Sequence, residues 1–161
     1  MIETINPSAI SGTIKVPPSK SSMQRACAAA LLTPGTTIID NFGTSNDEQA
    51  AISIITKLGA TVEKVGANLV ITSHDHIFRS AFPEKNLMVN CGESGLSMRM
   101  FAPIAALYNF DITFTGEGSI LTRPMNFFDE IFPQLGVEIN SNHGKLPLTL
   151  RGPVHPKNIT V

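Results

Sequence analysis

The hydrophobic and polar positions of this chain follow the same order of elements twice. Two glycine-led turns, Leu58-Gly59-Ala60-Thr61 and Leu135-Gly136-Val137-Glu138, each close an amphipathic stretch and open a short apolar run. A glycine at such a place is typical of a helix end that leads into a strand. The two glycines lie 136 − 59 = 77 positions apart. The pattern therefore predicts a duplicated unit, which we interpret as an α/β fold of repeated β-α-β-α-β-β units.

The first unit is expected at about residues 11–72. Residues 12–16 alternate and are β-branched, which predicts an opening strand. Apolar residues spaced by three and four positions predict a first helix that ends before Pro34. Ser45 followed by Glu48 has the pattern of a capping box and predicts the start of a second helix. Further strands are predicted at 36–41, 61–64 and 68–72.

The second unit is expected at about residues 87–152. Ser94 is predicted to cap a helix through about Leu107, in which Pro103 should produce a kink or an early end. Pro124 suits the first turn of a fourth helix. The inward side of the first of these helices is predicted to hold Leu96, Met100, Ile104 and Leu107, and that of the second Met125, Phe128, Phe132 and Leu135. The strands are predicted at 87–90, 111–115, 137–140 and 146–151.

Two stretches lie outside these units. The linker at 73–86 contains His74, Asp75 and His76, but histidines two positions apart in a polar connector are typical of solvated side chains, so no metal site is predicted. Residues 157–161 are expected to form the opening strand of a third unit. Because that strand would need its following helix to cover it, we expect residues 1–161 to be an incomplete domain, the N-terminal piece of a longer protein.

Composition narrows the class of protein. The 161 residues are 42% hydrophobic and 16% charged, and the net charge of −1 implies no general attraction to nucleic acid. No stretch approaches the roughly 20 apolar residues of a membrane span, and the N-terminus lacks the pattern of a secretory signal. Cys27 and Cys91 form neither a metal-ligand spacing nor a disulfide framework, so a cytoplasmic location and a buried Cys27 are expected.

Three strand-to-helix junctions carry candidate chemistry. At the first, Ser19-Lys20-Ser21 begins a helix and Arg25 lies one turn further, on the same face as Ser21. The free N–H groups of a helix start attract anions, and lysine or arginine next to them would bind a phosphate. The alternative is a serine-capped helix with solvated basic residues. The stretch lacks the glycines of a Walker A loop.

At the second junction Gly95 lies near a helix start and would let a ligand approach the backbone, with Arg99 one turn into the helix. A glycine needed only for packing is the alternative there. At the third, Arg123 precedes Pro124 at an expected helix N-terminus, where the helix dipole opposes a cation by about 0.3–1 kcal/mol. Such a cost favours a bound anion, although Glu117 could instead pair with Arg123.

The three junctions together resemble the 5-enolpyruvylshikimate-3-phosphate (EPSP) synthase family in order and spacing. The resemblance runs from about residue 10 to 161. It is carried by Pro18-Ser19-Lys20-Ser21 with Arg25, Gly92-Glu93-Ser94-Gly95 with Met98-Arg99, Gly116-Glu117 with Leu121-Thr122-Arg123-Pro124-Met125, the Leu135-Gly136 turn, and Pro147-Leu148-Thr149-Leu150-Arg151-Gly152.

This resemblance implies a cofactor-free and metal-free enzyme that transfers the enolpyruvyl group of phosphoenolpyruvate to the 5-hydroxyl of shikimate 3-phosphate. It also implies a monomer of two domains, each built from three such units. Lys20, Ser21 and Arg25 would bind shikimate 3-phosphate, and Lys20, Gly95 and Arg123 would bind phosphoenolpyruvate. The acid–base residues are expected beyond Val161, so the chain supplies part of the substrate site and is expected to be inactive alone.

Some positions depart from the family pattern. Glu93-Ser94-Gly95-Leu96 stands where the family commonly has Asn-Ala-Gly-Thr, so Glu93 adds a negative charge near an anionic substrate. Gly95 is retained, which is the glyphosate-sensitive pattern, and Pro18 replaces a glycine. One alternative is UDP-N-acetylglucosamine enolpyruvyl transferase, whose reactive cysteine is missing from the loop at 118–122. Another is a non-catalytic anion-binding module.

Overall fold

The computed structural model describes residues 3–4, 6–75, 86–155 and 157–159. Within them the chain forms a three-stranded and a four-stranded sheet, one for each predicted unit. The predicted α/β class is confirmed. The helices of the described ranges are all too short or too polar to cross a lipid bilayer.

The first unit follows the predicted order from its first helix onward. Its elements are α1 (Lys20–Leu32), β1 (Gly35–Asp40), α2 (Asn46–Lys57), β2 (Thr61–Val65) and β3 (Asn68–Ser73). The strands are antiparallel in the order β1-β3-β2. The predicted capping box is present at the start of α2, where the Ser45 backbone N–H donates to Glu48 Oε2 at 2.8 Å. Local sequence therefore sets where this helix begins.

The second unit repeats that order with one more strand. Its elements are β4 (Asn86–Asn90), α3 (Gly95–Ala105), β5 (Asp111–Thr115), the 3-10 turn η1 (Gly118–Thr122), α4 (Phe127–Ile131), the 3-10 turn η2 (Pro133–Leu135), β6 (Glu138–Ser141) and β7 (Leu148–Arg151). The sheet order is β4-β5-β7-β6, with β4 parallel to β5. Because β5-β7-β6 matches β1-β3-β2, the sheets carry the duplication.

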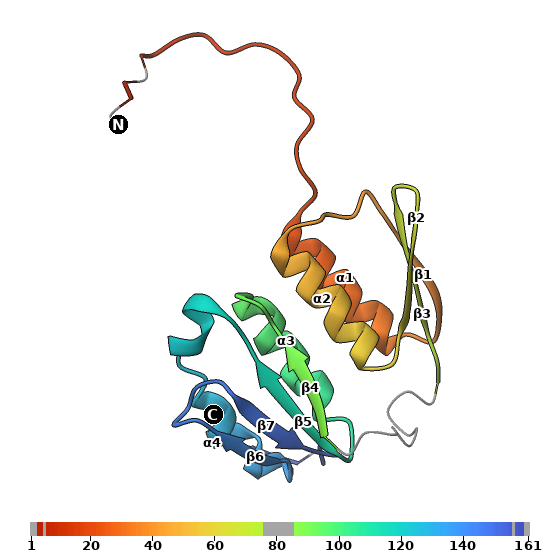
Figure 1. Cartoon of the computed structure of the whole chain (residues 1–161), viewed down its shortest axis with the longest axis vertical. Coiled ribbons are helices and arrows are strands. Elements are labelled where there is room, and N and C mark those ends of the chain that lie inside the picture. Colours follow the sequence, from red (N-terminus) through yellow and green to blue (C-terminus); the bar gives the residue numbers. More distant parts are fainter. Residues whose placement is uncertain (1–2, 5, 76–85, 156, 160–161) are drawn as a thin grey trace.

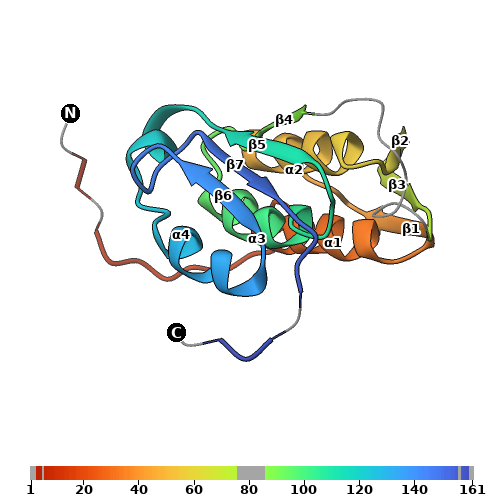
Figure 2. The same ribbon diagram turned by 90° about the horizontal axis from the view of Figure 1, so that it is seen from below.

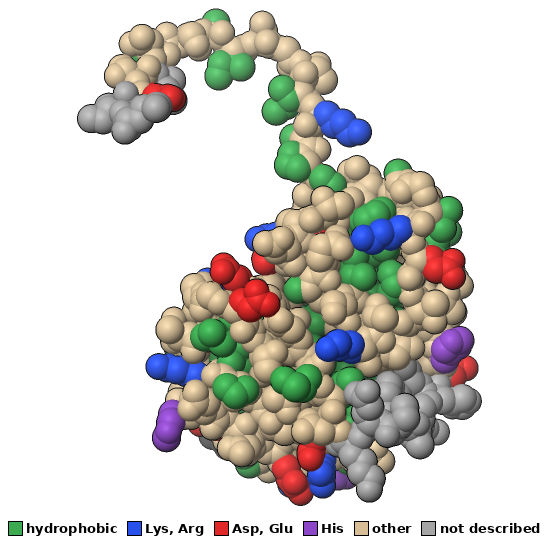
Figure 3. Space-filling model, in the orientation of Figure 1, with side chains coloured by type: hydrophobic (Ala, Val, Ile, Leu, Met, Phe, Trp, Pro, Cys, Tyr) green, Lys and Arg blue, Asp and Glu red, His purple; other side chains and the backbone are tan. Residues whose placement is uncertain are grey.

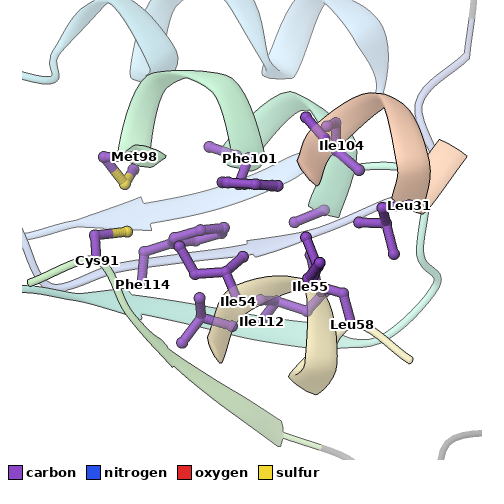
Figure 4. Packing of buried hydrophobic residues seen from close by; sticks show 14 of the residues in the cluster. Leu31, Ile54, Ile55, Leu58, Cys91, Met98, Phe101, Ile104, Ile112 and Phe114 are labelled. Carbon is purple, nitrogen blue, oxygen red and sulfur yellow. The ribbon is translucent and has the colours of Figure 1, made fainter. Parts of the chain in front are cut away.

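Helices α1, α2 and α3 lie between the two sheets (Figures 1 and 2). Helix α1 packs against α2, α3 and β3, whereas α2 also packs against β4. Figure 4 shows Met98 and Phe101 of α3 facing Ile54 of α2 and Phe114 of β5, and all four side chains are fully buried. The two units therefore share one hydrophobic core, which fixes the starts of α1 and α3 relative to each other.

The predicted opening strand at 12–16 is wrong. These residues form an extended segment that leaves the body of the molecule (Figure 1), and the Ile14 side chain is 83% exposed. Residues 157–159, the described part of the predicted strand at 157–161, also form no strand. An alternating pattern predicts faces, but a strand also needs a neighbour for its backbone N–H and C=O groups.

Both glycine-led turns are confirmed. Gly59 (φ +105°) follows α2, and Gly136 (φ +77°) is the left-handed residue after η2.

The linker begins later than predicted, because Ser73 is the last residue of β3. Its buried hydroxyl donates to the Leu31 carbonyl at 2.7 Å. His76 of the possible metal site lies outside the described residues.

The predicted inward face of α3 is partly wrong. Ile104 is buried, but Leu96, Met100 and Leu107 are only half-buried. The most buried side chains are Met98, Phe101, Ala102 and Ala105. Because this helix is apolar on most sides, the periodicity of its sequence could not determine which face is buried. It contains Pro103 and ends at Ala105, earlier than the predicted Leu107.

The fourth helix also begins later than predicted. It starts at Phe127, and Pro124 precedes it rather than standing in its first turn. The backbone N–H of Met125 donates to the Gly144 carbonyl at 2.6 Å, which ties this stretch to the loop between β6 and β7. As predicted, Phe128 and Phe132 are buried and Leu135 packs against the core.

Tyr108 links the two units through its hydroxyl, which donates to the Leu58 carbonyl at 2.5 Å. Burial raises the pKa of this phenol, so it remains a donor at any ordinary pH. Tyr108→Phe should lower the free energy of unfolding by about 1–3 kcal/mol, because it leaves a buried carbonyl without this donor. Urea unfolding followed by circular dichroism would measure the loss, and an unchanged midpoint would contradict it.

Candidate functional site

The start of α1 presents the first group of predicted site residues. Lys20 Nζ lies 2.8 Å from Asp47 Oδ2 in the first turn of α2. Hydrogen bonding and coulombic attraction to Asp47 raise the pKa of the Lys20 ammonium, so it stays charged. Half of the Lys20 side chain remains exposed (53%). A cation is therefore held at the helix start while still open to an anion from solution.

Ser21 and Arg25 lie on one face of α1, as their spacing predicted. Arg25 Nη1 donates to the Ser21 carbonyl at 3.2 Å, and the arginine is exposed. The Ser19 hydroxyl donates to the Ser22 hydroxyl at 3.0 Å rather than to a backbone group, so Ser19 does not cap α1 through its side chain. The first N–H groups of α1 thus lack this cap, in keeping with an anion site.

The start of α3 brings Gly95 and two arginines together. Arg99 Nη1 donates to the Gly95 carbonyl at 3.3 Å. A Cβ added at Gly95 would lie 2.9 Å from Arg99 Nη1 and 2.9 Å from Arg123 Nη1. Both guanidinium groups therefore lie beside Gly95, which has no side chain. We call Gly95, Arg99 and Arg123 the arginine cluster. Guanidinium groups in such a position suit carboxylate and phosphate oxygens.

Arg123 reaches this cluster for a reason other than the predicted one. It is the C-cap of η1, not the residue at the start of a helix, so the argument from an opposing helix dipole was wrong. Its Nη2 donates to the Ser119 hydroxyl at 3.1 Å. The alternative pairing with Glu117 is not seen, since Glu117 Oε1 accepts from Asn90 Nδ2 at 2.9 Å. The side chain is thus directed by η1 and Ser119.

Glu93 and Glu117 lie beside a polar hollow of about 460 Å³ between α2 and the start of α3. The Asn90 side chain accepts from the Gly92 N–H at 2.7 Å while it donates to Glu117. Glu93 lies against Gly118, where an added Cβ would collide with its carboxylate. The hollow is lined by Asn46, Gln49, Ala50, Ser53, Asn90, Gly92, Glu93 and Glu117.

Sequence reasoning missed the residue that joins these groups. Gln24 is fully buried in α1, and its Oε1 accepts from Ser94 Oγ and Ser97 Oγ, each at 2.9 Å. The sequence signal that could have identified it is its position: Gln24 lies three residues before Cys27 and seven before Leu31, on the same buried face of the helix. A polar residue on a buried helix face marks a hydrogen-bond network.

Other candidate groups add nothing to this site. Burial raises the pKa of both Cys27 and Cys91 to about 12, and both thiols are free. Within the described ranges no three His, Cys, Asp or Glu side chains are grouped as metal ligands. On the face drawn in Figure 3, the Lys and Arg side chains are scattered among Asp and Glu rather than gathered into a basic field.

Comparisons with known proteins identify the family of this chain. The family model described as EPSP synthase (3-phosphoshikimate 1-carboxyvinyltransferase) matches residues 5–160. A 3-phosphoshikimate 1-carboxyvinyltransferase of Clostridium kluyveri is 36% identical over 149 residues, which are 92% of this chain and 34% of that protein. One of Chlamydia felis is 39% identical over 121 residues, covering 75% of this chain and 26% of that protein.

A solved EPSP synthase from Acinetobacter baumannii has the same fold. It superposes with a TM-score of 0.77 at 23% identity, covering 93% of this chain and 34% of the solved chain. The chain therefore spans about a third of the length of the relatives it matches. With a family model that covers nearly all of its residues and curated relatives above 30% identity, the chain belongs to the EPSP synthase family.

Proposed function

We propose that this chain supplies part of the substrate site of a 3-phosphoshikimate 1-carboxyvinyltransferase. That enzyme moves the enolpyruvyl group of phosphoenolpyruvate to the 5-hydroxyl of shikimate 3-phosphate and releases phosphate, a step of the shikimate pathway towards aromatic amino acids. The observation that carries the proposal is the arginine cluster, in which two guanidinium groups converge over Gly95. Membership of the family and the names of its relatives support it.

The proposed roles follow from the two helix starts. Lys20, Ser21 and Arg25 bind the phosphate and hydroxyl groups of shikimate 3-phosphate at the start of α1. Lys20, Gly95 and Arg123 bind the phosphate and carboxylate of phosphoenolpyruvate, Gly95 by leaving room beside the backbone. Neither role needs a metal or a cofactor. The two free thiols suit a cytoplasmic protein, where we place the reaction.

The reaction needs proton donation to the enol carbon, attack by the 5-hydroxyl and loss of phosphate. The cations and backbone donors at the two helix starts bind anions, and we infer that the acid–base pair for these steps lies outside the 161 residues. We therefore propose that the 161 residues bind the two substrates without turning them over.

Calorimetry with shikimate 3-phosphate and phosphoenolpyruvate, combined with an assay of phosphate release, tests the proposal. Lys20→Ala and Arg25→Ala should each weaken shikimate 3-phosphate binding by about tenfold or more, since a bond to a charged group contributes about 1.5–3 kcal/mol. The exposed Lys145 in the loop between β6 and β7 offers a matched control, and Lys145→Ala should leave binding unchanged.

Each other outcome has a defined meaning. Phosphate release by the purified chain would refute binding without turnover. Failure of both compounds to bind the parent chain would refute the proposed substrate site and favour a non-catalytic module. Equal weakening in all three variants would show a general charge effect instead of a site.

A further inference from the structure

A buried glutamine joins the two helix starts that carry the proposed substrate groups. Gln24 Oε1 accepts from the hydroxyls of Ser94 and Ser97 on α3, each at 2.9 Å, and no part of the Gln24 side chain is exposed. Ser94 is the N-cap of α3, and its hydroxyl also accepts from the Ser97 N–H at 3.1 Å. The side-chain amide of Gln24 in α1 is thus hydrogen-bonded to Ser94, the N-cap residue of α3.

The other end of the same amide reaches the first turn of α1. Gln24 Nε2 donates to the Lys20 carbonyl at 3.4 Å, a long bond that still directs the amide along its own helix. Lys20 in turn is paired with Asp47 of α2. Lys20 therefore contacts Asp47 through its ammonium group and Gln24 through its backbone carbonyl, and Gln24 in turn accepts from Ser94, next to the arginine cluster.

A polar side chain in this place has a physical cost. The neighbours of Gln24 on the buried side of α1 include Met23, Cys27 and Ala28, and an unbonded amide among them would cost about 1–3 kcal/mol. An apolar residue would also fill the space between α1 and α3, but it would not select one rotation or one sliding position of the helices. Directional hydrogen bonds do select one.

We propose that Gln24 is a positioning residue that holds the start of α1 in one fixed register against the start of α3. It thereby sets the distance between Lys20 and the arginine cluster, so that both can bind the anionic groups of one pair of substrates. This inference rests on the proposed function for its ligands. Gln24 itself touches no substrate, since its amide is buried and occupied by the two serines and the Lys20 carbonyl.

The test compares Gln24→Met with the parent chain. Methionine has a similar length and no amide, so the serine hydroxyls lose their acceptor. Phosphoenolpyruvate and shikimate 3-phosphate, each titrated by calorimetry, should bind about tenfold more weakly, as a loss of helix register would produce. Without ligand, hydrogen exchange at the Ser97 amide should be about tenfold faster, because its acceptor Ser94 becomes free to rotate.

Ser73→Ala is the matched control. It removes another buried hydrogen bond of α1, at the opposite end, where the Ser73 hydroxyl donates to the Leu31 carbonyl. It should lower stability by a similar amount and leave both affinities and the Ser97 exchange rate unchanged. If Gln24→Met does not fold, Ser97→Ala, which removes one of the two hydroxyls and keeps Gln24, should show the same changes in smaller size.

The outcomes separate this inference from the proposed function. Parent-like binding and parent-like Ser97 exchange in the variant would overturn the positioning role and leave the function intact. Equal effects of Gln24→Met and Ser73→Ala would also overturn it, because the effect would then be one of general stability. If the parent binds neither compound, the proposed function fails, and the Ser97 exchange rate alone decides whether Gln24 sets the register.

Discussion

Arg123→Ala should weaken phosphoenolpyruvate binding by about 10- to 100-fold. The arginine approaches Gly95 beside Arg99, where it would bond a phosphate or carboxylate oxygen, and such a bond contributes about 1.5–3 kcal/mol. The fold should tolerate the change, because Arg123 is exposed and its side chain bonds the Ser119 hydroxyl of the neighbouring turn. Calorimetry would measure the affinity, and a urea titration would measure the stability.

Two further variants sharpen that result. Arg151→Ala removes the same charge from β7, where Arg151 is paired with Asp111, and should leave the affinity within about twofold because screening weakens distant surface charges. Arg123→Lys keeps the charge but loses the planar fork, so it should recover only part of the affinity. Unchanged binding in Arg123→Ala would exclude the arginine cluster as the phosphoenolpyruvate site.

The duplicated order of elements could be predicted because local rules specify it. The glycines at 59 and 136 end helical stretches, and the Ser45–Glu48 capping box begins α2 where expected. The opening strand at 12–16 could not be placed, since its alternating pattern does not say which strand it pairs with. The rotation of α3 was missed for a similar reason, because a helix apolar on most sides is oriented by its neighbours.

The sequence could nominate candidate site residues but not their geometry. Lys20, Gly95 and Arg123 were singled out by residue type and by resemblance, and the structure places Gly95 beside Arg123. The position of Arg123 beside Gly95 depends on η1, a short 3-10 turn that the periodicity of the sequence does not reveal. The bonds from Gln24 to Ser94 and Ser97 span 70 and 73 positions of sequence, so only the fold could show them.

Gly152→Ala should be far more destabilising than Gly95→Ala. An added Cβ would collide with the Ala106 carbonyl oxygen and would lie 2.6 Å from that of Tyr108. Both are backbone atoms at the end of α3, and the Ala106 carbonyl already accepts from the Val154 N–H at 2.8 Å. Since neither can move without displacing α3, the free energy of unfolding should fall by about 3 kcal/mol, measured by urea denaturation.

Gly95→Ala is the informative comparison, because its added Cβ would also meet atoms, each 2.9 Å away. Those atoms are the ends of two flexible arginine side chains, which can move aside at little cost in stability. Gly95→Ala should therefore keep the parent's unfolding midpoint and bind phosphoenolpyruvate about tenfold more weakly, since the methyl group displaces the guanidinium groups. Destabilisation of Gly95→Ala to the same extent as Gly152→Ala would contradict this contrast, and so would a Gly152→Ala variant with the stability of the parent. The contrast depends on what lies beyond each glycine: immovable backbone at the end of α3, and movable cations at its start.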